Sequence, residues 1–185
     1  MHALAIIIGL ASLASSTAIE RRVTYERPQG GNDFHLQVIA TAGNLTYSGQ
    51  FLGTYHTGAG FNALVPYNGQ DASRQEFHFD TSSGFISANL ASTNYVMNLN
   101  TSNLFDPPTG YSFVGFDVIQ SHNHFHFENP SQDLRFGPSY ADDIFAVCAT
   151  EIYTEGVKIP TLVYRSPEAK ANPACADVLV KAITL

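Results

Sequence analysis

Tryptophan is absent from the chain, and only three lysines occur among its 185 residues. The 9 basic residues are outnumbered by 16 acidic residues, which gives a formal net charge of −7. A protein that binds nucleic acid needs a basic surface to neutralise phosphates, and no basic cluster is visible in the sequence. Tryptophan is also the usual stacking platform of carbohydrate-binding modules. We therefore expect no nucleic-acid partner, and a sugar-binding surface would have to use other aromatic residues.

Long helices, disorder and repeats are missing as well. After the N-terminal segment, no long window has apolar residues at helical spacing, and no internal repeat or low-complexity tract is visible. Apolar residues make up 44% of the chain and charged residues 14%, which excludes a disordered protein. The length of 185 residues suits one domain with its own core.

Residues 1–18 form an apolar segment without any Asp, Glu, Lys or Arg. The apolar run 3–13 passes into small residues, and residues 16–18 fit the small-residue cleavage rule of secretory signals. The run is shorter than the roughly 20 apolar residues that span a bilayer. We expect a signal peptide over 1–18 and no membrane span. A buried N-terminal helix is the alternative.

A dibasic pair, Arg21-Arg22, follows this segment directly. Such a pair behind a signal peptide invites trimming by a protease of the secretory pathway. Residues 19–22 are therefore a candidate propeptide, and residues 23–185 the single secreted β domain. An ordinary pair of surface arginines is the alternative.

Two further features favour an extracellular protein. The only two cysteines are Cys148 and Cys175, and such a pair normally forms a disulfide in an oxidising compartment. In the chain-entropy model a bridge closing a loop of this length contributes ~3–4 kcal/mol. Asn44 and Asn100 begin sequons for N-glycosylation. We expect a secreted glycoprotein with one disulfide bond.

Short strand patterns recur along the chain. Residues 34–38 and 75–80 alternate apolar and polar side chains, and 13 Phe and 9 Tyr favour β structure. Clusters of Gly, Asn, Pro, Ser and Asp separate the patterns. Further strands are expected at 45–48, 51–56, 84–88, 94–99, 111–119, 122–127, 144–152 and 157–164. Many short strands without helices between them predict an all-β protein, a single antiparallel β-sandwich or barrel domain.

The most suggestive chemical pattern is the run of histidines before a glutamate at 122–128. In a strand, His122, His124, His126 and Glu128 share one face, because successive side chains alternate. Neutral imidazoles and a carboxylate suit a divalent transition metal. The spacing of the first two histidines and the glutamate resembles the first half of the cupin metal motif. This pattern predicts a metal site and, as one alternative function, a cupin-like metalloenzyme.

The cupin pattern is incomplete. The Pro-Gly that usually follows the second histidine is missing, and no histidine occurs after His126. A further ligand would have to come from His35, His56 or His78. The competing interpretation is a polar stripe on the solvent face of an amphipathic strand, with no cofactor.

Two tyrosines, Tyr47 and Tyr55, lie beside glycine-rich turns and can stack on sugar rings. The glycines at 58–60 lack the strand and helix of a dinucleotide-binding loop, so turns are the better interpretation. Tyrosines in strands usually pack in the core, which is the alternative for both residues. A glycan-binding module is therefore a second alternative function.

No catalytic motif is recognisable in the sequence. The nucleophile elbow Gly-x-Ser-x-Gly, the phosphate-binding loop and the zinc motif HExxH are all absent. A glycosidase needs two carboxylates at a defined separation, which the sequence alone does not place. We expect a non-enzymatic protein without catalytic residues.

Several blocks carry a family resemblance, namely residues 34–37, 49–53, 56–60, 145–148 and 173–178. With the N-terminal segment, they resemble the IgE-binding-protein-like or cell-surface family, small secreted proteins of filamentous fungi. The resemblance covers most of residues 30–185. It implies an extracellular, all-β and non-enzymatic protein of the cell wall or secretome, with allergen-like recognition and a role as effector or elicitor of host defence. The expected partners are a cell-wall polysaccharide or a host extracellular protein.

Overall fold

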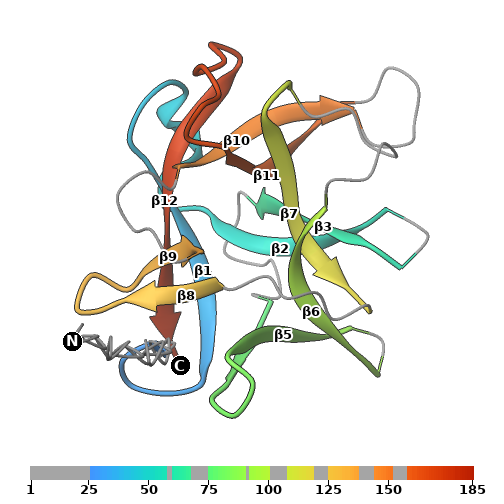
Figure 1. Ribbon diagram of the computed structural model, residues 1–185, viewed down its shortest axis with the longest axis vertical. Coiled ribbons are helices and arrows are strands. Elements are labelled where there is room, and N and C mark those ends of the chain that lie inside the picture. Colours follow the sequence, from blue (N-terminus) through green and yellow to red (C-terminus); the bar gives the residue numbers. More distant parts are fainter. Residues whose placement is uncertain are drawn as a thin grey trace, which may run out of the picture.

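The computed structural model describes residues 26–57, 60–67, 75–90, 92–100, 108–118, 125–137, 144–151 and 158–185. Within these ranges the chain forms twelve strands, and its one helical element is the 3-10 turn η1 (Leu45–Tyr47). All pairings between the described strands are antiparallel and join them into one sheet (Figure 1). The predicted class, an all-β domain with an antiparallel sheet, is confirmed. In the described part of the chain no helix is long and apolar enough to cross a membrane.

The strands have the following bounds: β1 (Asp33–Ala40), β2 (Phe51–His56), β3 (Asn62–Tyr67), β4 (Phe77–Asp80), β5 (Phe85–Leu90), β6 (Thr93–Asn100), β7 (Tyr111–Asp117), β8 (Phe125–Glu128), β9 (Asp133–Phe136), β10 (Ile144–Glu151), β11 (Lys158–Arg165) and β12 (Cys175–Thr184).

One expected strand is wrong. Residues 45–48 were assigned a strand pattern, but residues 45–47 form η1 instead. The cause is Asn44, whose side chain accepts a hydrogen bond from the backbone N–H of Thr46 at 3.1 Å. Asparagine competes with strand pairing in this way by bonding its own backbone two residues on.

The strands follow one another in three units of four. In each unit the middle strands form a hairpin: β2 with β3, β6 with β7, and β10 with β11. The outer strands pair with one another in the order β5-β4-β1-β12-β9-β8. The three hairpins meet through pairings of β7 with β3 and with β11. A wall of six outer strands joined to three converging hairpins is the topology of a β-trefoil, and Figure 1 shows β1, β12 and β9 side by side in that wall.

Two units share a turn of the same backbone geometry. The N–H of Gly84 donates to the carbonyl of Asp80 at 2.7 Å, and the N–H of Gln132 donates to that of Glu128 at 2.7 Å. Both donors have a positive φ, 74° for Gly84 and 63° for Gln132. The strands before these turns read Phe-His-Phe-Asp and Phe-His-Phe-Glu. The structure therefore contains an internal repeat, contrary to the expectation from the sequence.

The main core fills the space enclosed by the outer strands and the inner faces of the hairpins. Phe127 of β8 contacts Phe34 of β1 and Phe79 of β4, with ring centroids 5.0 and 6.3 Å apart. Phe77 stacks on Phe116 of β7 at 5.3 Å. Each of these side chains is at most 1% exposed, and burying one contributes about 1.5–3 kcal/mol. The barrel wall and the hairpins therefore share one rigid interior.

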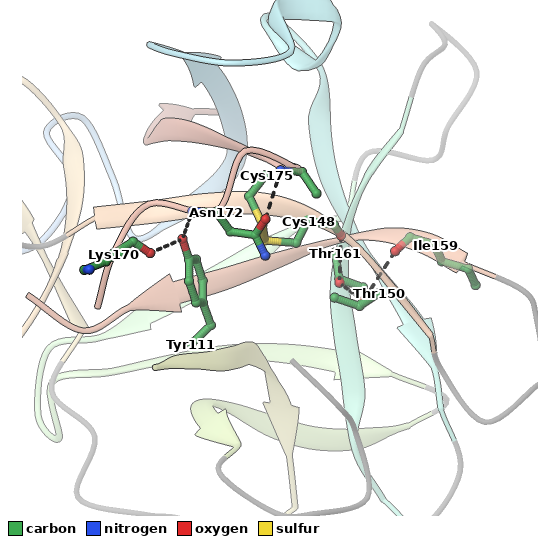
Figure 2. Close-up of a disulfide and its surroundings, with 9 residues drawn as sticks. Tyr111, Cys148, Thr150, Ile159, Thr161, Lys170, Asn172 and Cys175 are labelled. Carbon is green, nitrogen blue, oxygen red and sulfur yellow. Dashed lines mark hydrogen bonds between the residues drawn. A yellow bond between two sulfur atoms is a disulfide. The ribbon is translucent and has the colours of Figure 1, made fainter. Parts of the chain in front are cut away.

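A second, smaller core lies on the other face of the hairpins. Its buried members are Phe61, Ala63, Tyr111, Phe113, Ala146, Cys148, Val163 and Cys175. The connecting segment 166–174, between β11 and β12, packs Ala169 against this core. The Tyr111 hydroxyl accepts from the backbone N–H of Asn172 at 2.9 Å and donates to the Lys170 carbonyl at 3.4 Å (Figure 2).

The predicted disulfide is present and forms part of the second core. Cys148 of β10 and Cys175 of β12 occupy directly paired positions of the two strands. Beside the bridge, the buried hydroxyls of Thr150 and Thr161 hydrogen bond to each other, and the Thr161 hydroxyl also donates to the Cys148 carbonyl at 3.3 Å (Figure 2). The polar groups next to the bridge thus satisfy one another.

Candidate functional site

Two exposed tyrosines share one face of the β2–β3 hairpin. Tyr55 pairs with Ala63 and Gly53 with Val65 across the hairpin, and Tyr67 ends β3. Because side chains alternate along a strand, these five residues point to the same side. Tyr55 is 40% and Tyr67 37% exposed, whereas Ala63 and Val65 are buried. The two phenol rings therefore form the exposed edge of a face that is otherwise covered.

Tyr67 is held against the hairpin by a glycine. A Cβ atom at Gly53 would lie 2.4 Å from Cε2 of Tyr67 and 2.8 Å from Cδ2, closer than real contacts allow. The Tyr67 hydroxyl donates a hydrogen bond to the Thr54 carbonyl at 3.3 Å. Glycine at position 53 thus lets the ring lie across β2, and the hydroxyl fixes it there.

The surroundings of Tyr67 shift the pKa of its hydroxyl. Partial burial raises the pKa of Tyr67 above its usual value, and the nearby Tyr55 raises this pKa further, because two phenolate charges repel. The Tyr67 hydroxyl is therefore protonated and uncharged at neutral pH. The edge offers two phenol rings with polar tips.

Tyr47, the other tyrosine proposed for stacking, lies in η1. It is half-buried and packs against the main core. The partner that the hairpin gives to Tyr55 is Tyr67, which sequence reasoning missed. The signal that identifies it is the register of β2 and β3, which places a glycine beneath the ring.

The histidine stripe is described only at its end. His122 and His124 lie outside the described residues. His126 of β8 is buried, at 5% exposed, so it does not belong to a solvent-facing stripe. Glu128 Oε2 accepts a hydrogen bond from Arg135 Nε at 2.9 Å and forms an ion pair with the same guanidinium. The carboxylate predicted to bind a metal is thus already neutralised by an arginine.

The other histidines each contact a different group. Nδ1 of His35 lies 3.0 Å from the Gln75 carbonyl, and Nδ1 of His56 lies 3.0 Å from Asn62 Oδ1. His78 Nδ1 is 2.7 Å from a carboxylate oxygen of Asp33 in β1. Among the residues that the structure describes, no three His, Cys, Asp or Glu side chains gather to hold a metal ion.

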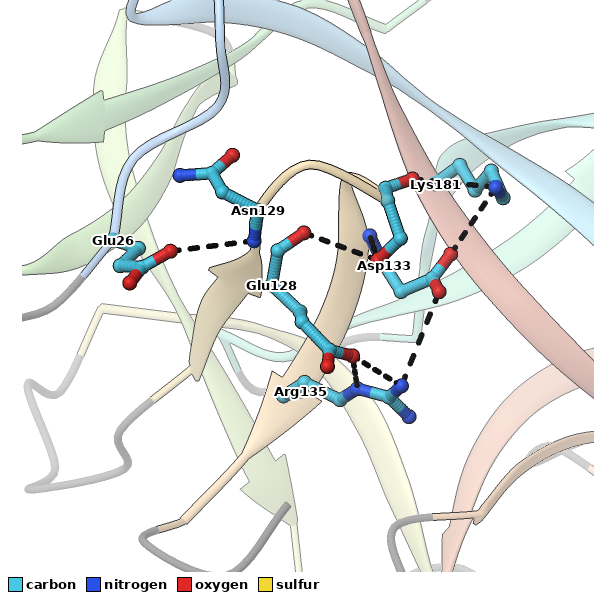
Figure 3. A network of polar contacts seen from close by, with 7 residues as sticks. Glu26, Glu128, Asn129, Asp133, Arg135 and Lys181 are labelled. Atoms are coloured by element: carbon cyan, nitrogen blue, oxygen red, sulfur yellow. Dashed lines mark hydrogen bonds and ion pairs between the residues drawn. The ribbon is translucent and has the colours of Figure 1, made fainter. Parts of the chain in front are cut away.

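Glu128 and Arg135 belong to a larger polar network at one end of the barrel wall (Figure 3). Arg135 also faces Asp133 at 3.9 Å, and Asp133 faces Lys181 of β12 at 3.5 Å. Lys181 donates a hydrogen bond to the Ser131 carbonyl at 3.2 Å. These alternating charges join β8, β9 and β12 and fix the turn between β8 and β9. The paired charges of this network therefore stabilise the fold.

Asp80 carries the strongest shift among the described acids, and its environment is that of a turn. Hydrogen bonds from the hydroxyls of Ser82 and Ser83, followed by the backbone N–H of Ser82, lower the pKa of Asp80 to about 2. The hydroxyl bonds measure 2.6 and 2.7 Å. The carboxylate stabilises the turn between β4 and β5.

The first sequon is accessible. Asn44 is exposed, and its Oδ1 accepts from the hydroxyl of Thr46 at 2.7 Å as well as from the Thr46 N–H. A glycan attaches to the side-chain nitrogen of asparagine, and neither of these bonds uses that atom. The side chain of Asn100, in the second sequon, lies outside what the structure describes.

Comparison with known proteins adds a family but no activity. Among solved structures, the full-length CARDS toxin is similar to this chain, with 11% sequence identity and a TM-score of 0.48. The similarity covers 82% of this chain and 26% of the toxin, so the chain spans about a quarter of the toxin's length. No curated protein matches the chain.

The family match extends over residues 31–183 and carries the description "Domain of unknown function (DUF7907)". It begins just before β1 and ends within β12, so it includes all three four-stranded units. Because the match spans most of the chain, the protein belongs to the DUF7907 family.

Proposed function

We propose that the protein is a secreted, non-enzymatic binding protein of a filamentous fungus. It acts at the cell wall or in the host-facing extracellular space, as an effector or elicitor of host defence. Its partner is a cell-wall polysaccharide or a host extracellular protein.

The observation that carries the proposal is the Cys148–Cys175 bridge over the second core. Disulfides of this kind form and persist in oxidising compartments. Two further features support secretion: the apolar segment 1–18 and the exposed sequon at Asn44. The extracellular space suits all three features.

A binding role is supported by how the described polar groups are used. Glu128 and Asp133 are occupied by Arg135 and Lys181, and Asp80 is occupied by serine donors. The two tyrosines of the β2–β3 hairpin, in contrast, are partly exposed, Tyr55 at 40% and Tyr67 at 37%. A surface of this kind recognises a partner without chemical change.

Expression of the full chain in a filamentous fungus tests the proposal. We expect the protein in the culture medium, with its N-terminus at residue 19 or 23 and a mass that falls on enzymatic deglycosylation. The purified protein should then be retained by isolated fungal walls or by extracellular host extract. A chain that stays inside the cell with residues 1–18 attached would overturn the proposal.

A further inference from the structure

We propose that Tyr55 and Tyr67 form a stacking platform for the sugar rings of a neutral polysaccharide. This inference rests on the proposed function and specifies its partner. The platform consists of the two phenol rings on the exposed edge of the β2–β3 hairpin, with Gly53 beneath Tyr67.

The rings suit a pyranose for chemical reasons. A tyrosine presents an apolar face and a polar tip, and a pyranose presents an apolar face of C–H groups bordered by hydroxyls. Stacking buries both apolar faces and leaves the hydroxyls of Tyr55 and Tyr67 at the edge, where they can bond to the sugar. Two neighbouring rings can hold successive units of a polymer.

The charges favour a neutral ligand. Neither β2 nor β3 contains Asp, Glu, Lys or Arg, so these strands provide no charged group for an ionic sugar. The net charge of −7 also repels an anionic polymer at long range. Neutral wall polymers such as β-1,3-glucan and chitin meet both conditions.

The size of the platform favours a sugar over a protein partner. A stable protein interface buries about 800 Å² on each side, whereas one aromatic side chain buries about 150–250 Å². Two partly exposed tyrosines supply well under half of the area that a protein needs. A narrow polysaccharide chain requires only the ring faces.

The platform is held in its binding geometry before a ligand arrives. Tyr67 is fixed by its bond to the Thr54 carbonyl and by contact with β2, while Leu52 and Leu64, on the opposite face of the hairpin, are buried in the main core. A side chain that is already ordered loses less entropy when it binds. This arrangement explains why a glycine occupies the centre of a strand at position 53, where it otherwise weakens the strand.

Binding of the full secreted protein to insoluble β-1,3-glucan and insoluble chitin tests the inference, with immobilised polygalacturonate as the anionic comparison. We expect retention on at least one neutral polymer and none on polygalacturonate. Tyr55→Ala and Tyr67→Ala should each weaken binding about 2- to 13-fold, the range expected for one aromatic contact. The double variant should abolish retention.

Three further variants separate the platform from a general effect on folding. Gly53→Ala keeps both tyrosines but displaces the Tyr67 ring, so it should weaken binding as much as Tyr67→Ala. Tyr67→Phe keeps the ring without its anchor and should lose less. Leu45→Ala removes an exposed apolar side chain from η1 and should leave binding unchanged. Thermal unfolding of each variant shows which of them are folded. If the Tyr67 variants do not fold, the binding of Tyr55→Ala alone tests the platform.

A soluble assay gives an independent reading. Because the chain has no tryptophan, its intrinsic fluorescence comes from tyrosine alone. Titration with laminarihexaose or chitohexaose should change this emission in the wild type and not in the double variant.

Two results would overturn the inference while leaving the proposed function in place: retention on whole walls that the double variant keeps in full, or stronger binding to polygalacturonate than to the neutral polymers. Intracellular retention of the chain would instead defeat the proposed function itself.

Discussion

The hydroxyl of Tyr111 accepts a hydrogen bond from the backbone N–H of Asn172 at 2.9 Å. The bond links a buried strand to the segment that covers it. Tyr111 begins β7, whereas Asn172 lies three residues before the disulfide-bonded Cys175. A hydrogen bond and a covalent bond therefore fasten the same short segment to two different hairpins.

Tyr111→Phe should lower the free energy of unfolding by about 1–2 kcal/mol, because it removes the bonds to Asn172 and Lys170 and keeps the ring. Urea unfolding followed by circular dichroism measures the loss. Tyr95→Phe is the matched control, since Tyr95 is half-buried against the main core and, among the described residues, its hydroxyl does not bond to the segment 166–174. Equal stability of the Tyr111 variant and the wild type would contradict the fastening.

The double variant Cys148→Ala, Cys175→Ala should be less stable by ~3–4 kcal/mol, because the bridge closes a loop with a sequence separation of 27. For a domain of this size the loss corresponds to a fall in Tm of roughly 6–15 °C. Calorimetry of the two proteins measures it. Reduction of the wild type should bring its Tm to that of the variant, and an unchanged Tm would show that the bridge does not stabilise the fold.

Asp80 should make the protein sensitive to acid. Its pKa in the folded state is about 2, below the value of 3.8 expected in the unfolded chain. A lowered pKa means that the carboxylate stabilises the fold above pH 4 and that this contribution disappears as the pH falls toward 2. Asp80→Asn should therefore be less stable than the wild type at pH 6, and the difference should close near pH 2. Thermal unfolding across this range checks the sign, and a constant difference would refute it.

Glu128→Gln should lower the free energy of unfolding by roughly 1 kcal/mol, because Arg135 loses its charged partner at a half-exposed site. The same experiment separates this role from metal binding. If the role of Glu128 is to pair with Arg135, EDTA should leave the Tm of both the wild type and the variant unchanged. A fall in Tm with EDTA that occurs only in the wild type would restore Glu128 as a metal ligand.

Local patterns predicted the elements that local forces determine. The strand expected at 51–56 matches β2, and those expected at 144–152 and 157–164 match β10 and β11 to within one residue at each end. The two cysteines allowed only one bridge. In each case the residues that carry the signal also form the structure.

The arrangement of the strands was not predictable in the same way. The three units are related by their strand pairings, and in the sequence they share only a short motif, Phe-His-Phe followed by an acid, in β4 and β8. Core positions accept many apolar residues, so equivalent strands need not look alike. Alignment of the sequence with itself at β4 and β8 would have revealed the repeat.

The candidate site shows the same limit. Tyr55 stood out because glycine-rich turns surround it, whereas Tyr67 gains its role only from the pairing with β2. His126 was expected on the side of its strand away from Phe125 and Phe127, in a polar stripe, yet its side chain is buried in the fold. Alternation predicts which side chains share a side, but tertiary packing decides whether that side meets water.

The pairing of β1 with β12 determines when this protein can fold. Phe34 lies opposite Thr184, so β1 cannot complete its pairing until the ten-residue strand β12 has been synthesised. Cys175, at the start of β12, is likewise synthesised long after β1. During synthesis β1 therefore has an open edge, and neither the sheet nor the bridge can be completed until β12 has emerged. A chaperone that shields β1 until then would protect the stage at which this chain is most prone to aggregate.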